Sequence, residues 1–204
     1  MVYEAGETLV KKYKFKRITK NVYQGRLISF ENEKEYFNFL IKIDLNAIKK
    51  GNLPVVKEIE NKIPNSSEYH KHVKSDSFCF GVGIYTRLIF NQMKRDFTIF
   101  IDKYVMGYLY SVTFKDIFGV WAADEFSHNE DKAKKEAFSK LFGLTGFNNI
   151  TINQFKNNIN DYSSDCFCNS GKSFTLCHLD FCKDSLEYLK KKEILSELSS
   201  IEVE

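Results

Sequence analysis

Phe37-Asn38-Phe39-Leu40-Ile41-Lys42-Ile43-Asp44-Leu45 is the stretch that decides the fold. Large apolar residues occupy every odd position, and polar residues occupy the even ones apart from Leu40. A period of two residues is typical of a β-strand with one buried face. Residues 37–45 are therefore predicted to be a strand of a half-buried sheet.

The segment before this strand is its expected partner. Residues 22–30 are rich in β-forming residues, and Glu31-Asn32-Glu33-Lys34 supplies a polar connection. The two segments are predicted to pair as an antiparallel hairpin. Residues 4–13 are expected to form a short helix in front of it.

A long helix is the second strong prediction. Apolar residues recur at i, i+3 and i+4 at Phe97, Phe100, Ile101, Tyr104, Val105, Tyr108, Leu109 and Val112. This stripe is typical of a helix with a buried face, and we expect it to pack against the hairpin sheet. The fold class indicated is α+β, an antiparallel sheet packed on helices.

Residues 46–78 lack a clear period and contain both prolines of the chain, Pro54 and Pro64. They are predicted to be a long irregular segment, which in a small domain is usually functional or disordered. The segment runs through Tyr69-His70-Lys71-His72 and ends at Cys79. Taken alone, a cysteine between phenylalanines is more often a core residue than a nucleophile.

The only tryptophan lies in a second polar loop, which reads Gly119-Val120-Trp121-Ala122-Ala123-Asp124-Glu125-Phe126-Ser127-His128-Asn129. Glu125 and His128 could reach Cys79. A capping role for Ser127 or Asn129 in the next helix, residues 132–142, is the more frequent use of such residues. Gly143 is expected to end that helix, and Thr151-x-x-Gln154 is predicted to be a capping box for another. Leu186, Leu189, Leu195 and Leu198 predict a charged C-terminal helix.

Residues of the types that bind metal ions are concentrated in one stretch, which reads Cys166-Phe167-Cys168-Asn169-Ser170-Gly171-Lys172-Ser173-Phe174-Thr175-Leu176-Cys177-His178. Three cysteines and one histidine lie within thirteen residues, which is the ligand set of a closed Cys₃His zinc site. Gly171 tolerates a positive φ, so Cys177 and His178 can fold back onto Cys166 and Cys168. Zinc is thus the expected cofactor.

The alternative, a disulfide framework, is disfavoured. Cys166 and Cys168 are too close for an easy mutual bridge, and the first twenty residues contain no segment typical of a signal peptide. Cys182 is predicted to pack as a small apolar residue. We expect the zinc element to pin the C-terminal helix to the domain. A surface that recruits a partner, with Lys172 and Phe174 as its exposed residues, is the alternative.

Length and composition set the outer limits. A chain of 204 residues fits one compact domain plus an appendage, predicted as residues 1–160 and 161–204. The formal charge of +3, without a basic tract, argues against a nucleic-acid partner. No apolar run has the length of a membrane-spanning helix, so neither a membrane partner nor membrane insertion is expected. A reducing, cytoplasmic setting is the simplest interpretation.

Two stretches resemble known families. The cysteine-rich stretch resembles the SEC-C motif, a zinc element known from the SecA translocase and many other bacterial proteins. Residues 22–143 resemble bacterial relatives of ubiquitin-conjugating enzymes, with Cys79 as the anchor. The matching residues are Leu53-Pro54, Val56, Glu58, Ile63-Pro64, His72-Val73, Ser75-Asp76, Cys79-Phe80-Gly81, and Gly119, Trp121, Glu125, Ser127 and His128. Ser77 and Asn129 stand where those relatives have glycine, and the Pro and Asn of the eukaryotic His-Pro-Asn tripeptide are absent.

The second resemblance implies an enzyme with a UBC-like fold. Cys79 would carry the C-terminus of a protein as a thioester and pass it to a protein or small amine, with His72 or His128 assisting. The implied acyl donor is a ubiquitin-like modifier or, in antiphage CBASS operons, a cGAS-like nucleotidyltransferase; we favour the antiviral setting. Two rivals remain: a non-catalytic zinc-containing interaction module, and a hydrolase with a Cys79–His128 nucleophile–base pair.

Overall fold

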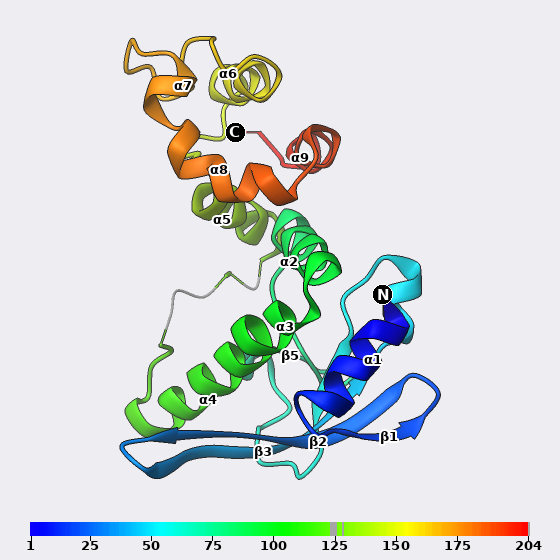
Figure 1. The fold of residues 1–204 in the computed structure, drawn as a ribbon. Helices are drawn as coiled ribbons and strands as arrows, with labels where there is room; N and C mark the ends of the chain where they lie inside the picture. Colours follow the sequence, from blue (N-terminus) through cyan, green and yellow to red (C-terminus); the bar gives the residue numbers. More distant parts are fainter. Residues whose placement is uncertain (123–125, 128, 204) are drawn as a thin grey trace. The chain divides into compact units, whose positions relative to one another are not determined.

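The computed structural model describes residues 1–122, 126–127 and 129–203 of the chain. It is an α+β protein, as predicted, and divides into two compact units (Figure 1). The first comprises Met1–Phe80 and Gln92–Glu125, and the second Gly81–Asn91 and Phe126–Glu204. The boundary expected after residue 160 falls inside the second unit, and that domain division stays a prediction.

An antiparallel four-stranded sheet forms the first unit's base. Its strands follow sequence order: β1 (Lys16–Thr19), β2 (Val22–Glu31), β3 (Lys34–Asp44) and β4 (Val55–Glu58). The predicted hairpin is β2–β3, and its register pairs Glu31 with Lys34. Asn32 and Glu33 between them have φ values of 49° and 65°, as a tight two-residue hairpin turn requires.

The prediction that residues 46–78 are irregular is wrong in part, because β4 pairs with β3 there. Val56 and Glu58 face the core, and Glu58 is only 1% exposed. Its carboxylate accepts the backbone N–H groups of Glu60 at 2.5 Å and Lys62 at 2.8 Å. The rest of this stretch contains the 3₁₀ turns η1 (Asn46–Lys50) and η2 (Ser67–Tyr69) and the two-residue strands β5 (Lys71–His72) and β6 (Ser77–Phe78).

Helices cover the apolar face of the sheet. The N-terminal helix α1 (Val2–Lys11) begins two residues before the expected segment. It packs on β2, where a methyl group on Gly6 would lie 2.2 Å from the Tyr23 hydroxyl oxygen. The predicted long helix is continuous but contains a π-helical segment: α3 (Phe97–Ile99), η3 (Phe100–Val105) and α4 (Met106–Phe118). All eight residues of its apolar stripe are buried.

The first helix after Cys79 is α2 (Gly83–Arg95), which the sequence patterns did not indicate. The helix that contains residues 97–112 is therefore the second helical segment after the cysteine. The buried residues of α2 belong to two units: Ile84 and Leu88 to the second, and Met93 to the first. A helix that is buried on more than one side has no single apolar stripe.

The second unit contains α5 (Glu130–Phe142), α6 (Asn149–Asn160), α7 (Phe174–Cys177), α8 (Leu179–Tyr188) and α9 (Lys191–Leu198). As predicted, Asn129 caps α5, accepting the Lys132 N–H at 2.9 Å, and Gly143 ends it with a φ of 66°. These helices enclose an aromatic core that includes Phe138, Phe142 and Phe155.

Two predictions for the C-terminal part are wrong. The cap of α6 is Asn148, whose side chain accepts the Thr151 N–H at 2.9 Å, so Thr151 does not open a capping box. The single C-terminal helix is two helices, because the buried Leu189 is extended between α8 and α9. Among the described residues, no helix combines the length and apolar character needed to cross a membrane.

Candidate functional site

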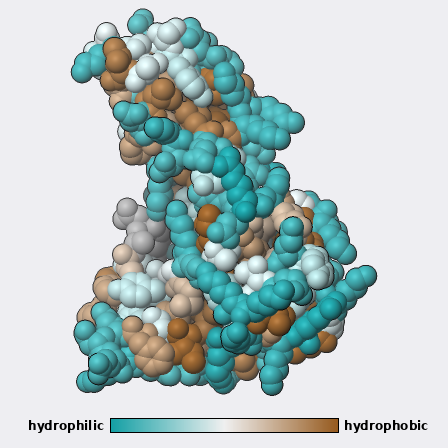
Figure 2. Space-filling view, viewed as in Figure 1, coloured by the Kyte–Doolittle hydropathy of each residue, from teal (hydrophilic) through white to brown (hydrophobic). Residues whose placement is uncertain are grey.

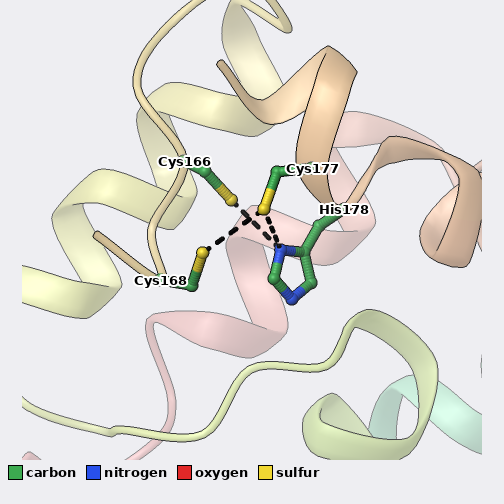
Figure 3. Close-up of side chains that lie close together, drawn as sticks. All are labelled: Cys166, Cys168, Cys177 and His178. Atoms are coloured by element: carbon green, nitrogen blue, oxygen red, sulfur yellow. Dashed lines mark hydrogen bonds between the residues drawn. The ribbon is translucent and has the colours of Figure 1, made fainter. Parts of the chain in front are cut away.

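The four predicted metal ligands converge in the second unit (Figure 3). Cys166 and Cys168 lie in the turn after α6, Cys177 ends α7, and His178 joins α7 to α8. Their ligand atoms all lie within 4.8 Å of one another. The chain therefore contains a Cys₃His cluster that could hold a metal ion.

Distances within the cluster suit tetrahedral coordination. Nδ1 of His178 lies 3.2 Å from Sγ of Cys166 and 3.2 Å from Sγ of Cys177, and the Cys168 and Cys177 sulfurs are 3.5 Å apart. Zinc–sulfur bonds of about 2.3 Å in a tetrahedron place two sulfurs about 3.8 Å apart. Small outward movements would seat an ion, so the residues present fit the group.

A tight turn brings the first pair of ligands to the second. The Cys166 N–H donates to the Lys172 carbonyl at 2.9 Å, and the Asn169 N–H donates to the Cys166 carbonyl at 3.0 Å. Gly171 has a φ of 71°, as predicted for a left-handed turn residue. An isolated bridge between Asp165 and Ser173 closes the base of the turn.

Asn158 of α6 supports this turn, and the sequence analysis missed it. Its side chain is fully buried, and Oδ1 accepts the Phe167 N–H at 2.9 Å. Nδ2 donates to the Asp165 carbonyl at 2.7 Å and to Ser164 Oγ at 2.8 Å. A buried side-chain amide with three hydrogen bonds to this turn fixes the backbone that carries Cys166 and Cys168.

The aromatic residues of the motif are core rather than surface. Of the two residues named for the alternative recruiting surface, Phe174 is fully buried and Lys172 is exposed. The Phe167 ring lies 4.7 Å from the His178 ring and 5.4 Å from that of Phe155 in α6. Burial of these rings couples the position of the ligand loop to the core of the unit.

Two of the cysteine thiols differ in pKa. Burial raises the pKa of Cys166 to about 12. Burial also acts to raise the pKa of Cys168, but hydrogen bonds from Ser170 and Cys177 to its sulfur outweigh this and lower the pKa to about 7. The cluster therefore contains one thiol that ionises readily and one that needs a cation to ionise.

The remaining cysteine of this region behaves as predicted. Cys182 is fully buried, and its thiol donates to the Phe142 carbonyl at 3.4 Å. None of the five cysteines forms a disulfide in the structure. The large apolar side chains exposed near the cluster are Leu176 of α7, at 77%, and Phe181 of α8, at 58%.

Cys79 lies in the first unit, one residue after β6, and is partly exposed. Strand β6 pairs with β5, with Lys71 opposite Phe78 and His72 opposite Ser77. The next position places His70 opposite Cys79, and the Cys79 N–H donates to the His70 carbonyl at 2.7 Å. His70 is thus the histidine adjacent to Cys79 in the register, whereas His72 is exposed two residues further along, and its role stays a prediction.

Aromatic residues hold the turn before Cys79 against α4. The Tyr108 hydroxyl donates to the Tyr69 carbonyl at 2.5 Å, and the Tyr69 hydroxyl donates to Asp116 at 2.8 Å. The His70 ring lies 4.8 Å from that of Trp121. Burial, with smaller contributions from the negative charges of Cys79 and Asp76, raises the pKa of Tyr108, so its phenol stays protonated and can donate.

A buried lysine ties the two sides of this loop together. The Lys71 side chain is 2% exposed and forms an ion pair with Asp76, whose backbone has a φ of 52°. Its Nζ also donates to the Ile63 carbonyl at 3.3 Å. The lysine therefore links residue 63, β5 and the turn that leads to β6 and Cys79.

The second polar loop is described only in part. Glu125 and His128, the residues of this loop that could reach Cys79, lie outside the described residues, so their roles stay predictions. Ser127 accepts the Asn129 N–H at 3.2 Å, and its own N–H donates to Glu136 at 2.6 Å. Ser127 therefore helps Asn129 to fix the start of α5.

Comparisons were made with protein-family models, with curated proteins and with solved structures. None of the three gives a match for this chain.

Proposed function

We propose that the chain is a ubiquitin-conjugating-like enzyme that carries the C-terminus of a protein as a thioester on Cys79. The position of Cys79 carries this proposal: it is partly exposed and, along the sequence, it follows the antiparallel sheet and precedes α2. The element order of helix, four antiparallel strands, loop, cysteine and helix is compatible with the fold that the resemblance of residues 22–143 implies.

The chemistry needs a nucleophilic sulfur and little else. The Cys79 thiolate attacks the activated acyl carbon of the donor, the carbon–sulfur bond forms, and the donor's leaving group departs. An amine nitrogen then attacks the same carbon, the carbon–sulfur bond breaks, and the amine releases a proton to solvent. Because a thioester is already activated, the second step requires positioning more than a strong base.

The loop contacts support the positioning. The Tyr108 hydroxyl holds the Tyr69 carbonyl, and the His70 carbonyl holds the Cys79 N–H. The cysteine backbone is thereby connected to α4 through two hydrogen bonds. His70 is the candidate positioning residue in this arrangement, beside the predicted His72 and His128.

Within this proposal, the acyl donor is the C-terminus of a cGAS-like nucleotidyltransferase in a cytoplasmic antiphage system, or else a ubiquitin-like modifier. The acceptor is a protein or small amine. The resemblance supports this setting, and the genes beside this one would identify the donor.

The test is co-expression with the neighbouring operon proteins, read by intact mass and non-reducing gels. We expect a thiol-sensitive adduct on wild type, none on Cys79→Ala, and a thiol-resistant ester on Cys79→Ser. If wild type and Cys79→Ala behave identically, and Cys79 is inert to a thiol reagent in the native protein, the conjugating function is wrong.

We also infer that the Cys₃His cluster binds zinc in a structural role. Three thiolates and one imidazole at tetrahedral spacing are the donor set that zinc prefers, and they leave no open position for a substrate. Bound zinc supplies folding energy rather than chemistry, because the ligands come from two segments that it holds together.

A second candidate function is a non-catalytic interaction module, and the exposure of Leu176 and Phe181 favours it. Figure 2 shows hydrophobic residues at the surface over α7 and α8. In this case Leu176→Ser with Phe181→Ser would abolish a partner complex, whereas Cys79→Ala would leave it intact. The opposite pattern would support conjugation.

A further inference from the structure

An apolar groove lies in the first unit between the β2–β3 turn and the C-terminal half of α4. Its volume is about 490 Å³. Figure 2 shows hydrophobic residues gathered at the surface in this area. The apolar lining residues are Tyr36, Tyr110, Phe114, Ile117 and Phe118. None of them belongs to the Cys79 loop or the metal cluster, so the groove is independent of the proposed function.

The lining is a continuous row of rings. Centroids are separated by 5.1 Å from Tyr36 to Tyr110, by 6.2 Å from Tyr110 to Phe114, and by 4.4 Å from Phe114 to Phe118. The spacing of four residues places the three α4 rings on one face of the helix. Tyr110, Ile117 and Phe118 are 42%, 57% and 60% exposed. A contiguous exposed apolar surface of this kind is typical of a protein-interaction site.

The rim of the groove is acidic. Glu31 and Glu35 line it, Glu33 lies in the turn between them, and Lys34 is the single cation among the described residues of the lining. No ion pair within the described part of the chain engages these three carboxylates. An acidic rim repels nucleic acid and anionic membranes and attracts cationic side chains.

We propose that this groove docks a short amphipathic segment of a partner protein, whose apolar residues are flanked by lysine or arginine. The ring row receives the apolar residues, and the three glutamates receive the cations. Apolar anchors provide most of the affinity in such sites, and charge complementarity selects the partner.

The test uses the full chain and three labelled fourteen-residue peptides, with binding read by fluorescence anisotropy. The first has Leu at i, i+3, i+4 and i+7 and Lys elsewhere; the second has Glu for every Lys; the third is a scramble of the first. We expect the first to bind at least about tenfold more tightly than the other two. Ile117→Ser with Phe118→Ser should weaken it about tenfold. Glu31→Gln with Glu35→Gln should reduce the preference for Lys over Glu.

The matched control is Ile150→Ser, which removes a side chain that is 70% exposed in the other unit and should leave binding unchanged. Equal binding of the Lys and Glu peptides, or undiminished binding by the Ile117→Ser, Phe118→Ser variant, would overturn the proposal. So would sedimentation showing a dimer of wild type that this variant abolishes, since the occupant would then be a second copy of the chain.

Discussion

The missing side chain of Gly143 makes room for the imidazole of His178: a methyl group at that position would lie 3.2 Å from Cδ2 of the ring. Gly143 also ends α5 with a φ of 66°. Gly143 therefore has two structural roles. It ends a helix in the left-handed conformation, which is energetically unfavourable for other residues, and it leaves space for a metal ligand.

These two roles can be separated by substitution. Gly143→Ala should destabilise the protein by about 1–2 kcal/mol through the left-handed backbone alone. The added methyl group should also push the His178 ring away from the metal position and weaken metal binding by about tenfold, the size of effect that residues orienting a metal ligand usually have.

Gly119→Ala is the matched control, because Gly119 ends α4 with a φ of 75° and has nothing within 4 Å of its added methyl group. Chemical denaturation and competition with a zinc indicator measure the two effects. Equal metal affinity in both variants would show that the ring is not displaced.

Substitution of the buried Asn158 should strongly destabilise the second unit. Asn158→Ala removes three hydrogen bonds and leaves buried backbone groups of the ligand turn unpaired. We expect a loss of roughly 2–4 kcal/mol in unfolding free energy, with weaker metal binding. Asn157→Ala, on the exposed side of the same helix, should change stability little. Similar denaturation midpoints for the two variants would contradict the role given to Asn158.

The ion pair between the buried Lys71 and the half-buried Asp76 of the Cys79 loop gives a third prediction. Lys71→Met keeps the buried stem but leaves the Asp76 carboxylate without its cation. Because the Asp76 side chain is 35% exposed, we expect a cost of about 2 kcal/mol rather than that of a fully buried pair. Hydrogen exchange should increase over residues 62–79, and Asp76→Asn in the same chain should recover part of the loss. Lys74→Met, at an exposed lysine of the same loop, should have no such effect.

Local patterns of the sequence were sufficient to predict several elements. The alternation at residues 37–45 and the stripe at residues 97–112 each reflect one buried face, and both predictions are confirmed. Elements without a single apolar face could not be predicted in this way. In β4 one of the two buried residues is a glutamate rather than an apolar residue, and α2 has buried residues in two units.

The candidate sites could likewise be predicted only where the pattern is local in the sequence. The metal ligands were identified because their spacing is local, and the structure brings all four together. Asn158 and His70 were missed because their importance depends on contacts that spacing does not show: the hydrogen bonds of Asn158 to the ligand turn, and the strand register that places His70 opposite Cys79. Phe174 was named as an exposed residue only for the alternative role of the zinc element in recruiting a partner, but the structure buries it in the core.

Metal removal should unfold one part of the chain and leave the rest intact. The ligand loop is tied to the second unit through Phe167 and Phe174, while the sheet and α4 belong to the first unit. A strong chelator should therefore increase hydrogen exchange after about residue 162 and leave residues 16–58 protected. Cys168→Ser should reproduce this pattern without chelator, because Cys168 is exposed and makes no contribution to the core. Zinc added back should restore protection in wild type alone. If chelation left residues 162–178 protected but abolished a partner complex, the metal would serve recognition rather than folding.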